Sequence, residues 1–154
     1  NCEKCFSIED CLEISNIINI PVVFDTHHFQ CYKLLHPDEY LKEEEFYIPL
    51  ILNTWKKRNI KPKFHISEQG SGKIGHHSDY IKQIPNYLLE IYDKYDTKID
   101  IMIEAKMKEQ AIFNLYEKYD FLNKSRQKRR VKRNHLRKKL ILKSNNFEEL
   151  CECC

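Results

Sequence analysis

VVFDTHH, residues 22–28, is an apolar run that ends in one carboxylate and two imidazoles. The β-branched and aromatic residues before Asp25 predict a short buried strand. Carboxylate and imidazole groups are ligands for divalent ions such as manganese, zinc, iron and cobalt. We therefore interpret this segment as a strand whose end presents metal ligands.

Two later segments repeat this pattern. KPKFHIS, residues 61–67, is a second short strand that carries Lys63 and His65, and KIDIMIEA, residues 98–105, is a third buried strand that ends near Glu104. The loop after the second strand contains His77. Ligands of α/β proteins gather beyond the carboxyl ends of parallel strands, so we expect these groups to converge.

Amphipathic segments separate the three strands and predict helices over residues 8–19, 37–59, 84–96 and 106–122. Ser7 is a plausible N-cap for the first helix. Pro49 lies inside the second and is expected to break or kink it. Short apolar strands that alternate with such helices predict an α/β fold with a parallel sheet.

Composition favours a soluble globular domain, with 154 residues of which 42% are hydrophobic and 32% charged. No run of 18 apolar residues is present, so we expect no membrane partner. No secretory leader is apparent, so we expect an intracellular protein, nuclear in a eukaryote and otherwise cytoplasmic. The sequence begins at Asn1 rather than methionine, and we expect a processed product or a fragment.

Seven cysteines occur, an odd number, and three of them crowd the last four residues. Without a secretory signal they predict reduced thiols. An alternative is a zinc site that joins the termini through Cys2, Cys5, Cys151, Cys153 and Cys154. No second CxxC motif or histidine pair completes that pattern, which favours ordinary terminal cysteines.

Charge divides the chain into two predicted domains. Residues 1–123 hold 15 Lys and Arg against 20 Asp and Glu, a net charge of −5, and residues 124–154 hold 11 against 3, a net charge of +8. The basic tail can be a solvated helix, a nuclear localisation signal or a nucleic-acid-binding arm. The candidate DNA-binding residues in it are Lys128, Arg129, Arg130, Lys132 and Arg133.

Four segments together resemble one known family. In this order and spacing, VVFDTHH, KPKFHIS, HHSDYI and DIMIEAKMKEQAIFNL are similar to the C-terminal half of UV damage endonucleases, over about residues 1–120. The resemblance implies the C-terminal part of a TIM (β/α)8 barrel of the endonuclease IV and xylose isomerase-like type. The implied activity is DNA repair by metal-dependent phosphodiester hydrolysis 5′ to UV photoproducts, such as cyclobutane pyrimidine dimers and 6-4 photoproducts.

The resemblance also implies a set of site residues. Metal ligands would be Asp25, His28, His65, His77 and Glu104. Lys63 stands at the position of the family's active-site lysine, which can be modified to a carbamate, and Lys106 is expected to contact a DNA phosphate. The implied cofactor is a cluster of divalent ions, Mn²⁺ in the first place and Mg²⁺, Co²⁺ or Zn²⁺ as alternatives.

Three strands cannot close an eight-stranded barrel, which takes about 250 residues. The family has further metal ligands on earlier strands, so we expect this chain alone to lack a complete site and to cleave DNA poorly. The expected partners are damaged double-stranded DNA and an N-terminal half barrel. The alternatives are another metal-dependent TIM-barrel enzyme, either an abasic-site endonuclease or a sugar isomerase, and an inactive DNA-binding remnant.

Overall fold

The structure, a computed structural model, describes residues 4–122. The chain divides into two compact units, residues 1–113 and 114–154. The predicted boundary after residue 123, the basic residues 128–133 and the zinc alternative at the terminal cysteines lie outside the described residues, apart from Cys5. These three points stay predictions.

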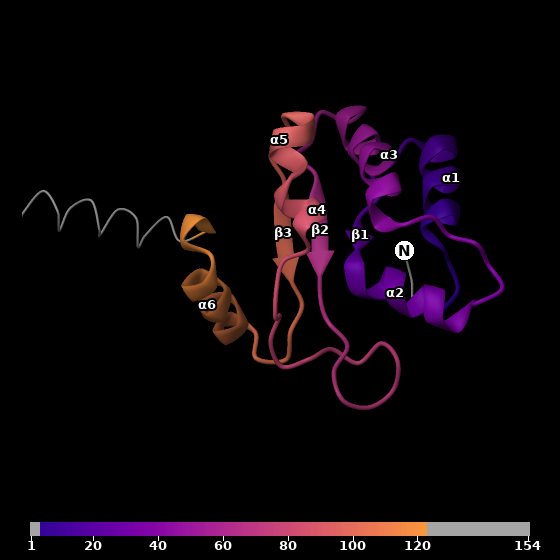
Figure 1. Cartoon of the computed structure of the whole chain (residues 1–154). Coiled ribbons are helices and arrows are strands. Elements are labelled where there is room, and N and C mark those ends of the chain that lie inside the picture. The colour runs from indigo at the N-terminus through magenta and orange to yellow at the C-terminus, as the bar shows by residue number, and fades with distance from the viewer. Residues whose placement is uncertain (1–3, 123–154) are drawn as a thin grey trace, which may run out of the picture. The chain divides into compact units, whose positions relative to one another are not determined.

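Three parallel strands form one sheet in the first unit (Figure 1), in the order β1-β2-β3. The strands are β1 (Phe24–Asp25), β2 (Lys63–Ile66) and β3 (Asp100–Ile103). Asp25 lies opposite His65 in the register of β1 and β2. The prediction of an α/β fold with a parallel sheet is confirmed, although β1 is shorter than predicted.

The helices are α1 (Ile8–Ile18), α2 (Thr26–Leu35), α3 (Glu44–Lys56), α4 (Asn86–Leu89), α5 (Ile91–Tyr95) and α6 (Glu109–Lys118), followed by the 3-10 helix η1 (Asp120–Leu122). Ser7 caps α1, as predicted. Its hydroxyl oxygen accepts from the N–H of Asp10 (3.1 Å), and the Asp10 carboxylate accepts from the N–H of Ser7 (2.8 Å). This reciprocal capping satisfies backbone donors that a helix start leaves unbonded.

None of the helices in the described part of the chain has the length and apolar character needed to cross a bilayer.

Two helix predictions were wrong in detail. The predicted helix over residues 37–59 begins only at Glu44, and Pro49 lies within α3 without ending it. Pro49 is exposed, so water can solvate the carbonyl group that it leaves without an N–H donor, while buried Ile48 and Ile51 hold the helix in place. The predicted helix over residues 84–96 forms as two short helices, α4 and α5.

Helix α3 anchors the start of the sheet. The N–H of Val22 donates to the hydroxyl of Thr54 (3.0 Å), and the indole N–H of Trp55 donates to the carbonyl of Val22 (2.7 Å). All three residues are buried. Helix α3 thus holds the chain just before β1, so that Asp25 emerges at the far end of the strand.

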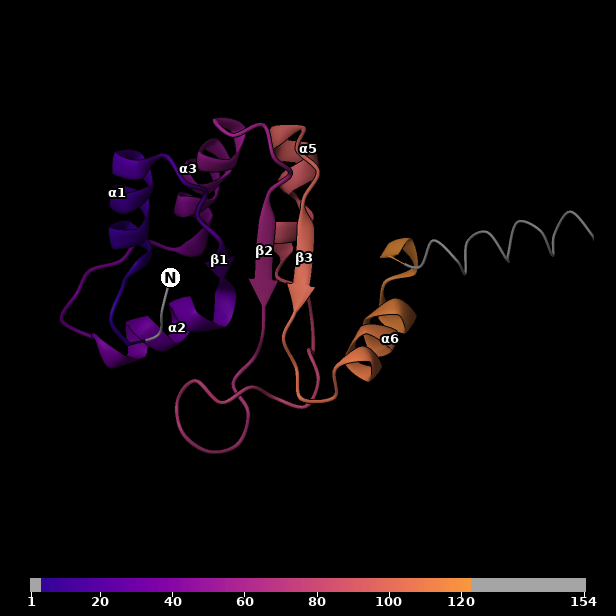
Figure 2. The same ribbon diagram turned by 180° about the vertical axis from the view of Figure 1, so that it is seen from behind.

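The two faces of the sheet differ. Phe24, Phe64 and Ile66 are at most 1% exposed and form one face. In Figure 1 α4 and α5 lie in front of β2 and β3, and in Figure 2, seen from behind, the strands lie in front of the helices. The opposite face carries Lys63 and Met102, both exposed in the described part of the chain.

The third strand was predicted to be buried, and this was wrong, because none of its four residues is buried. Met102 is 49% exposed, whereas its neighbours Ile101 and Ile103 are partly covered. Alternate side chains of a strand point to opposite faces. In the described part of the chain, helices cover the face that carries Phe64 and Ile66 and leave the other face open (Figure 1 and Figure 2). We call the uncovered side, with Val23, Lys63, His65 and Met102, the open face.

Candidate metal centre

Asp25 is held at the junction of β1 and α2. It is the N-cap of α2, and its Oδ1 accepts from the N–H groups of His27 (2.8 Å) and His28 (3.0 Å). The hydroxyl of Ser67, which follows β2, lies 3.4 Å from the same oxygen. Asp25 is 4% exposed. The cap fixes the carboxylate so that Oδ2 faces His65, with 4.0 Å between Oδ2 and His65 Nδ1.

Asp25, His65 and Glu104 come together at the carboxyl ends of the three strands. One ligand atom from each lies within 4.8 Å of the others. The nearest pair is His65 Nδ1 and Glu104 Oε1, 2.6 Å apart. Glu104 is placed by the sheet, since its N–H continues the ladder with the carbonyl of Ile66 (2.9 Å). Strand register therefore builds this triad.

His77 approaches the same glutamate from the loop after β2. Its Nε2 lies 3.8 Å from Oε2 of Glu104, so the two oxygens of Glu104 face two different imidazoles. The ring of His28 lies 6.3 Å from the ring of His77, centre to centre. All five residues that the resemblance implied as ligands thus gather at one end of the sheet.

The other predicted site residues lie around this cluster. Lys63 is exposed on the open face, two residues before His65 on the same side of β2. Lys106 is exposed, and its N–H donates to the carbonyl of Ser78 (3.0 Å), which ties the segment after β3 to the loop that carries His77. Of the predicted DNA-binding residues, only Lys106 lies among the described residues.

Sequence reasoning missed helix α2. It also missed that Asp25 is both the N-cap of this helix and a candidate metal ligand. The helix puts His27 on its buried side, with the ring nitrogen Nδ1 3.5 Å from the sulfur of Cys31. The ring of His27 lies 5.9 Å from that of His77. An aspartate directly before a ten-residue helix is an N-cap signal that could have revealed both the helix and the fixed carboxylate.

The donor set suits a divalent metal. Two carboxylates and three imidazoles, from Asp25, Glu104, His28, His65 and His77, are hard-to-borderline ligands of the kind that bind manganese, iron, cobalt or zinc. The triad is buried to half-buried, so a cation placed there would be partly shielded from water. A cation would also offset the repulsion between the two carboxylates.

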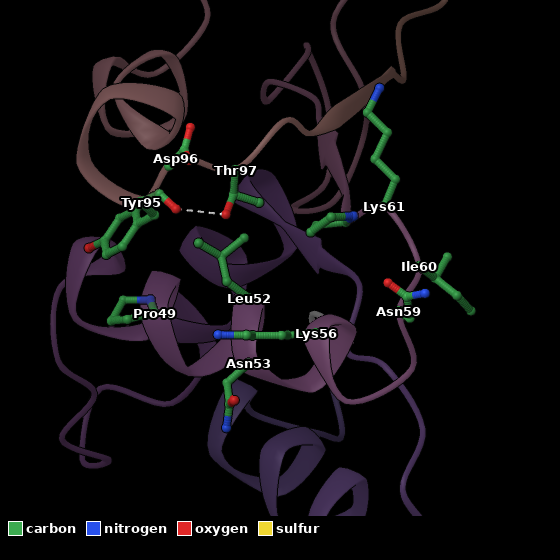
Figure 3. Close-up of a pocket in the computed structure, with 11 residues that line it drawn as sticks. Pro49, Leu52, Asn53, Lys56, Asn59, Ile60, Lys61, Tyr95, Asp96 and Thr97 are labelled. Atoms are coloured by element: carbon green, nitrogen blue, oxygen red, sulfur yellow. Dashed lines mark hydrogen bonds between the residues drawn. The ribbon is translucent and has the colours of Figure 1, made fainter.

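A separate cavity of about 640 Å³ lies at the opposite end of the first unit (Figure 3). Residues of α3, of the segment before β2 and of the segment before β3 line it, among them Leu52, Lys56, Lys61 and Thr97. The hydroxyl of Thr97 donates to the carbonyl of Tyr95 there (2.9 Å). None of the predicted site residues within the described part of the chain lines this cavity, so the candidate centre is the cluster at the carboxyl ends.

The fold and the residue cluster define a class of protein: a parallel α/β protein with a candidate divalent-metal site at the carboxyl ends of its strands. Comparison with known proteins narrows this class. The sequence matches the family described as UV-endonuclease UvdE over residues 1–134. The chain belongs to this family.

Several relatives show the same similarity. A putative UV-damage endonuclease of Acanthamoeba polyphaga mimivirus is 36% identical over 122 residues, which cover 77% of this chain and 35% of the relative. The UV DNA damage endonuclease of Bacillus velezensis is 34% identical over 121 residues, 76% of this chain and 36% of the relative. The UV-damage endonuclease of Schizosaccharomyces pombe is 35% identical over 133 residues, 80% of this chain and 20% of the relative.

Among solved structures, the crystal structure of SacUVDE matches with a TM-score of 0.56 and 30% sequence identity. The match covers 80% of this chain and 39% of that one. The chain thus spans about a third of the length of the first two relatives and a fifth of the length of the third.

Proposed function

We propose that this chain is the C-terminal part of a TIM-barrel DNA repair nuclease that hydrolyses a phosphodiester bond on the 5′ side of UV photoproducts. The observation that carries the proposal is the gathering of Asp25, His65 and Glu104 at the carboxyl ends of three parallel strands. Membership in the UV-endonuclease UvdE family supports the DNA substrate. Such a role would put the protein with the genome, in the nucleus of a eukaryote or otherwise in the cytoplasm.

Divalent ions, with Mn²⁺ as the first choice and Mg²⁺, Co²⁺ or Zn²⁺ as alternatives, would supply an activated water and neutralise charge on the leaving oxygen. Asp25 and His65 would hold such an ion from two neighbouring strands. Glu104 would help to hold the ions, because its two carboxylate oxygens face His65 (2.6 Å) and His77 (3.8 Å) separately. His28 would complete the set on the side of His77.

An N-terminal half barrel is the partner that this proposal requires, in the same chain or in another one. The open face exposes Val23 and Met102, which have apolar side chains, and β1 and β3 are both edge strands of the described sheet. Edge strands and exposed apolar faces favour pairing with further strands. Relatives of about three times the matched length are long enough to supply the missing strands.

The proposed role of Lys63 as the active-site lysine requires a closed barrel. It lies on the open face, below His65, where added strands would enclose it beside the metal ligands. We infer that Lys63 then serves as the active-site lysine, as an ammonium or as a carbamate that adds a carboxylate to the ligand set.

The decisive experiment is incision of a duplex that carries one cyclobutane dimer, with Mn²⁺ present. The chain is tested alone and mixed with the N-terminal half of a relative. We expect cutting 5′ to the dimer only in the mixture, and at least ~100-fold less cutting with Glu104→Gln, since loss of a carboxylate ligand weakens both the site and the charge stabilisation. Glu90→Gln, which breaks only the exposed pair with Lys94, is the matched control.

Equal cutting by the Glu104→Gln mixture would sink the metal-site proposal. Faster cutting of a duplex with an abasic site than of the dimer duplex would favour an abasic-site endonuclease instead. Tight binding without cutting in any mixture would favour a DNA-binding remnant. Replacing Mn²⁺ by Mg²⁺, Co²⁺ or Zn²⁺ in the same assay ranks the metals.

The basic tail should add affinity for DNA without sequence preference. Residues 124–139 hold ten Lys and Arg, and phosphate contacts by such side chains release counterions. Deleting residues 124–143 is expected to flatten the slope of log affinity against log salt by roughly 0.9 for each lost phosphate contact. Binding titrations from 50 to about 200 mM salt measure the slope. Lys106→Ala should reduce the slope by roughly 0.9, the value for one phosphate contact. An unchanged slope after deletion of the tail would contradict the proposed role of the tail.

A further inference from the structure

The loop that carries His77 is held at its base by backbone pairing. The N–H of Gly70 donates to the carbonyl of His76 (2.6 Å), and Gln69 pairs with His77 in an antiparallel bridge. In Figure 1 this loop lies below the arrowhead of β2. We call residues 68–78 the His77 loop. Its base places His77 at the end of the sheet, but its tip needs further support.

One side chain inside the loop supplies that support. The amide nitrogen of Gln69 donates to the carbonyls of Gly70 (2.8 Å) and Lys73 (3.0 Å), and its amide oxygen accepts from the N–H of Gly75 (3.0 Å). Three backbone groups of an irregular loop are satisfied in this way by one side chain. Loop backbone that lacks such partners must rely on water and is more mobile.

Gln69 also reaches helix α2. The sulfur of Cys31 lies 4.0 Å from the amide oxygen of Gln69, and the same sulfur lies 3.5 Å from Nδ1 of His27. The glutamine therefore links the His77 loop to α2, the helix that carries His28. These two segments supply the imidazoles that lie 6.3 Å apart, centre to centre.

We propose that Gln69 is a positioning residue: its side chain braces the His77 loop so that His77 faces Glu104 and can bind a divalent ion. Glutamine suits the role because one amide offers two N–H donors and one acceptor. Glutamate would lack the donors for Gly70 and Lys73, and methionine has similar length without either function. The inference deepens the proposed function and rests on it for the metal.

The test compares Gln69→Met with wild type in the full chain, and the matched control is Gln83→Met at an exposed glutamine near the same loop. Two readouts are used. Without metal, a nuclear Overhauser effect between the rings of His28 and His77 reports their proximity. During titration with Zn²⁺, the ring nitrogen shifts of His65 and His77 report direct ligation of each ring.

For wild type and Gln83→Met we expect the ring contact and Zn²⁺ shifts of both histidines. For Gln69→Met we expect loss of the ring contact, an unchanged response of His65, and about tenfold more Zn²⁺ to shift His77, the size usual for residues that orient ligands. A retained ring contact with an unchanged response of His77 would overturn the inference. Equal weakening of His65 and His77 would overturn it too, because a general loss of structure moves both.

If Zn²⁺ shifts neither ring in wild type, the histidines of this chain do not bind the ion without an N-terminal half barrel, and the positioning role is decided by the metal-free contact alone. Loss of that contact in Gln69→Met then supports the brace, and its persistence overturns it.

Discussion

Thr54 joins two elements through a single hydroxyl. It accepts from the N–H of Val22 (3.0 Å) and donates to the carbonyl of Ile51 (2.7 Å), and all of these groups are buried. Thr54→Val keeps the shape but leaves the N–H of Val22 without its acceptor, so we expect the free energy of unfolding to fall by about 1–3 kcal/mol. Urea denaturation measures it. Thr97→Val, at a half-buried hydroxyl, is expected to cost less than ~1 kcal/mol, and equal losses would contradict the argument.

Tyr47 makes stability depend on pH. Burial and the hydrogen bond to Glu9 (2.6 Å) raise the pKa of Tyr47 to about 12, and burial with the hydrogen bond to Glu39 raises the pKa of Tyr32 to about 12. A tyrosine of the unfolded chain titrates near pH ~10. Above that pH the unfolded chain holds fewer protons than the folded one. The contribution of these tyrosines to the free energy of unfolding is therefore fully present below pH ~10 and is lost as the pH rises towards 12.

Tyr47→Phe is therefore expected to flatten the loss of stability between pH ~10 and 12, because one of the shifted phenols is gone. Urea denaturation at pH 9, 10 and 11 measures the slope. Thr54→Val is the comparison, since it lowers stability without removing a phenol and should leave the slope as in wild type. A slope that Tyr47→Phe does not change would show that this tyrosine is not the source.

At the level of elements, the His77 loop depends on a glycine. A Cβ on Gly70 would lie 2.2 Å from the carbonyl oxygen of His77, which is backbone and cannot move without the loop. Gly70→Ala should therefore separate the antiparallel bridge between Gln69 and His77. We expect the free energy of unfolding to fall by about 1–3 kcal/mol, and metal binding by His77 to weaken more than metal binding by His65. Thermal unfolding and the histidine ring shifts measure both effects. Ser71→Ala, one residue along on the exposed side, should change neither.

Element lengths also show where local signals suffice. The cap of α1 by Ser7 and the three apolar strands follow from neighbouring residues, and the structure confirms them. The start of α3 at Glu44 does not follow from neighbouring residues. Residues 37–43 have a composition that favours a helix, but they lie outside the helix that packs on Val22. Helix α2 was not predicted, because its histidines were interpreted as ligands at the end of a strand, whereas Asp25 caps a helix there.

At the level of the whole molecule, the proposed pairing with an N-terminal half barrel would use the open face. Met102 lies beside His65 in the register of β2 and β3 and is 49% exposed. Met102→Glu should leave the isolated chain folded and more soluble, because it replaces an exposed apolar side chain by a charge. It should weaken pairing with an N-terminal half by about tenfold or more, because pairing would bury an unpaired carboxylate.

Sedimentation or calorimetric titration with the half barrel measures the pairing. Tyr92→Glu is the control, since it adds the same charge at an exposed position of α5, on the helix-covered side. Equal weakening by both variants would point to net charge rather than to the open face.

By itself the sequence determined the α/β class and the three strands, since strand pattern is a local property. Asp25, His65 and Glu104, which gather at the strand ends, belong to the ligand set that the resemblance to UV damage endonucleases implied. Only the tertiary structure decided that Glu104 stands between His65 and His77, that Gln69 braces the loop and that one face of the sheet is open. These features depend on strand register and on which helices cover the sheet, and both arise from contacts between residues far apart in the chain.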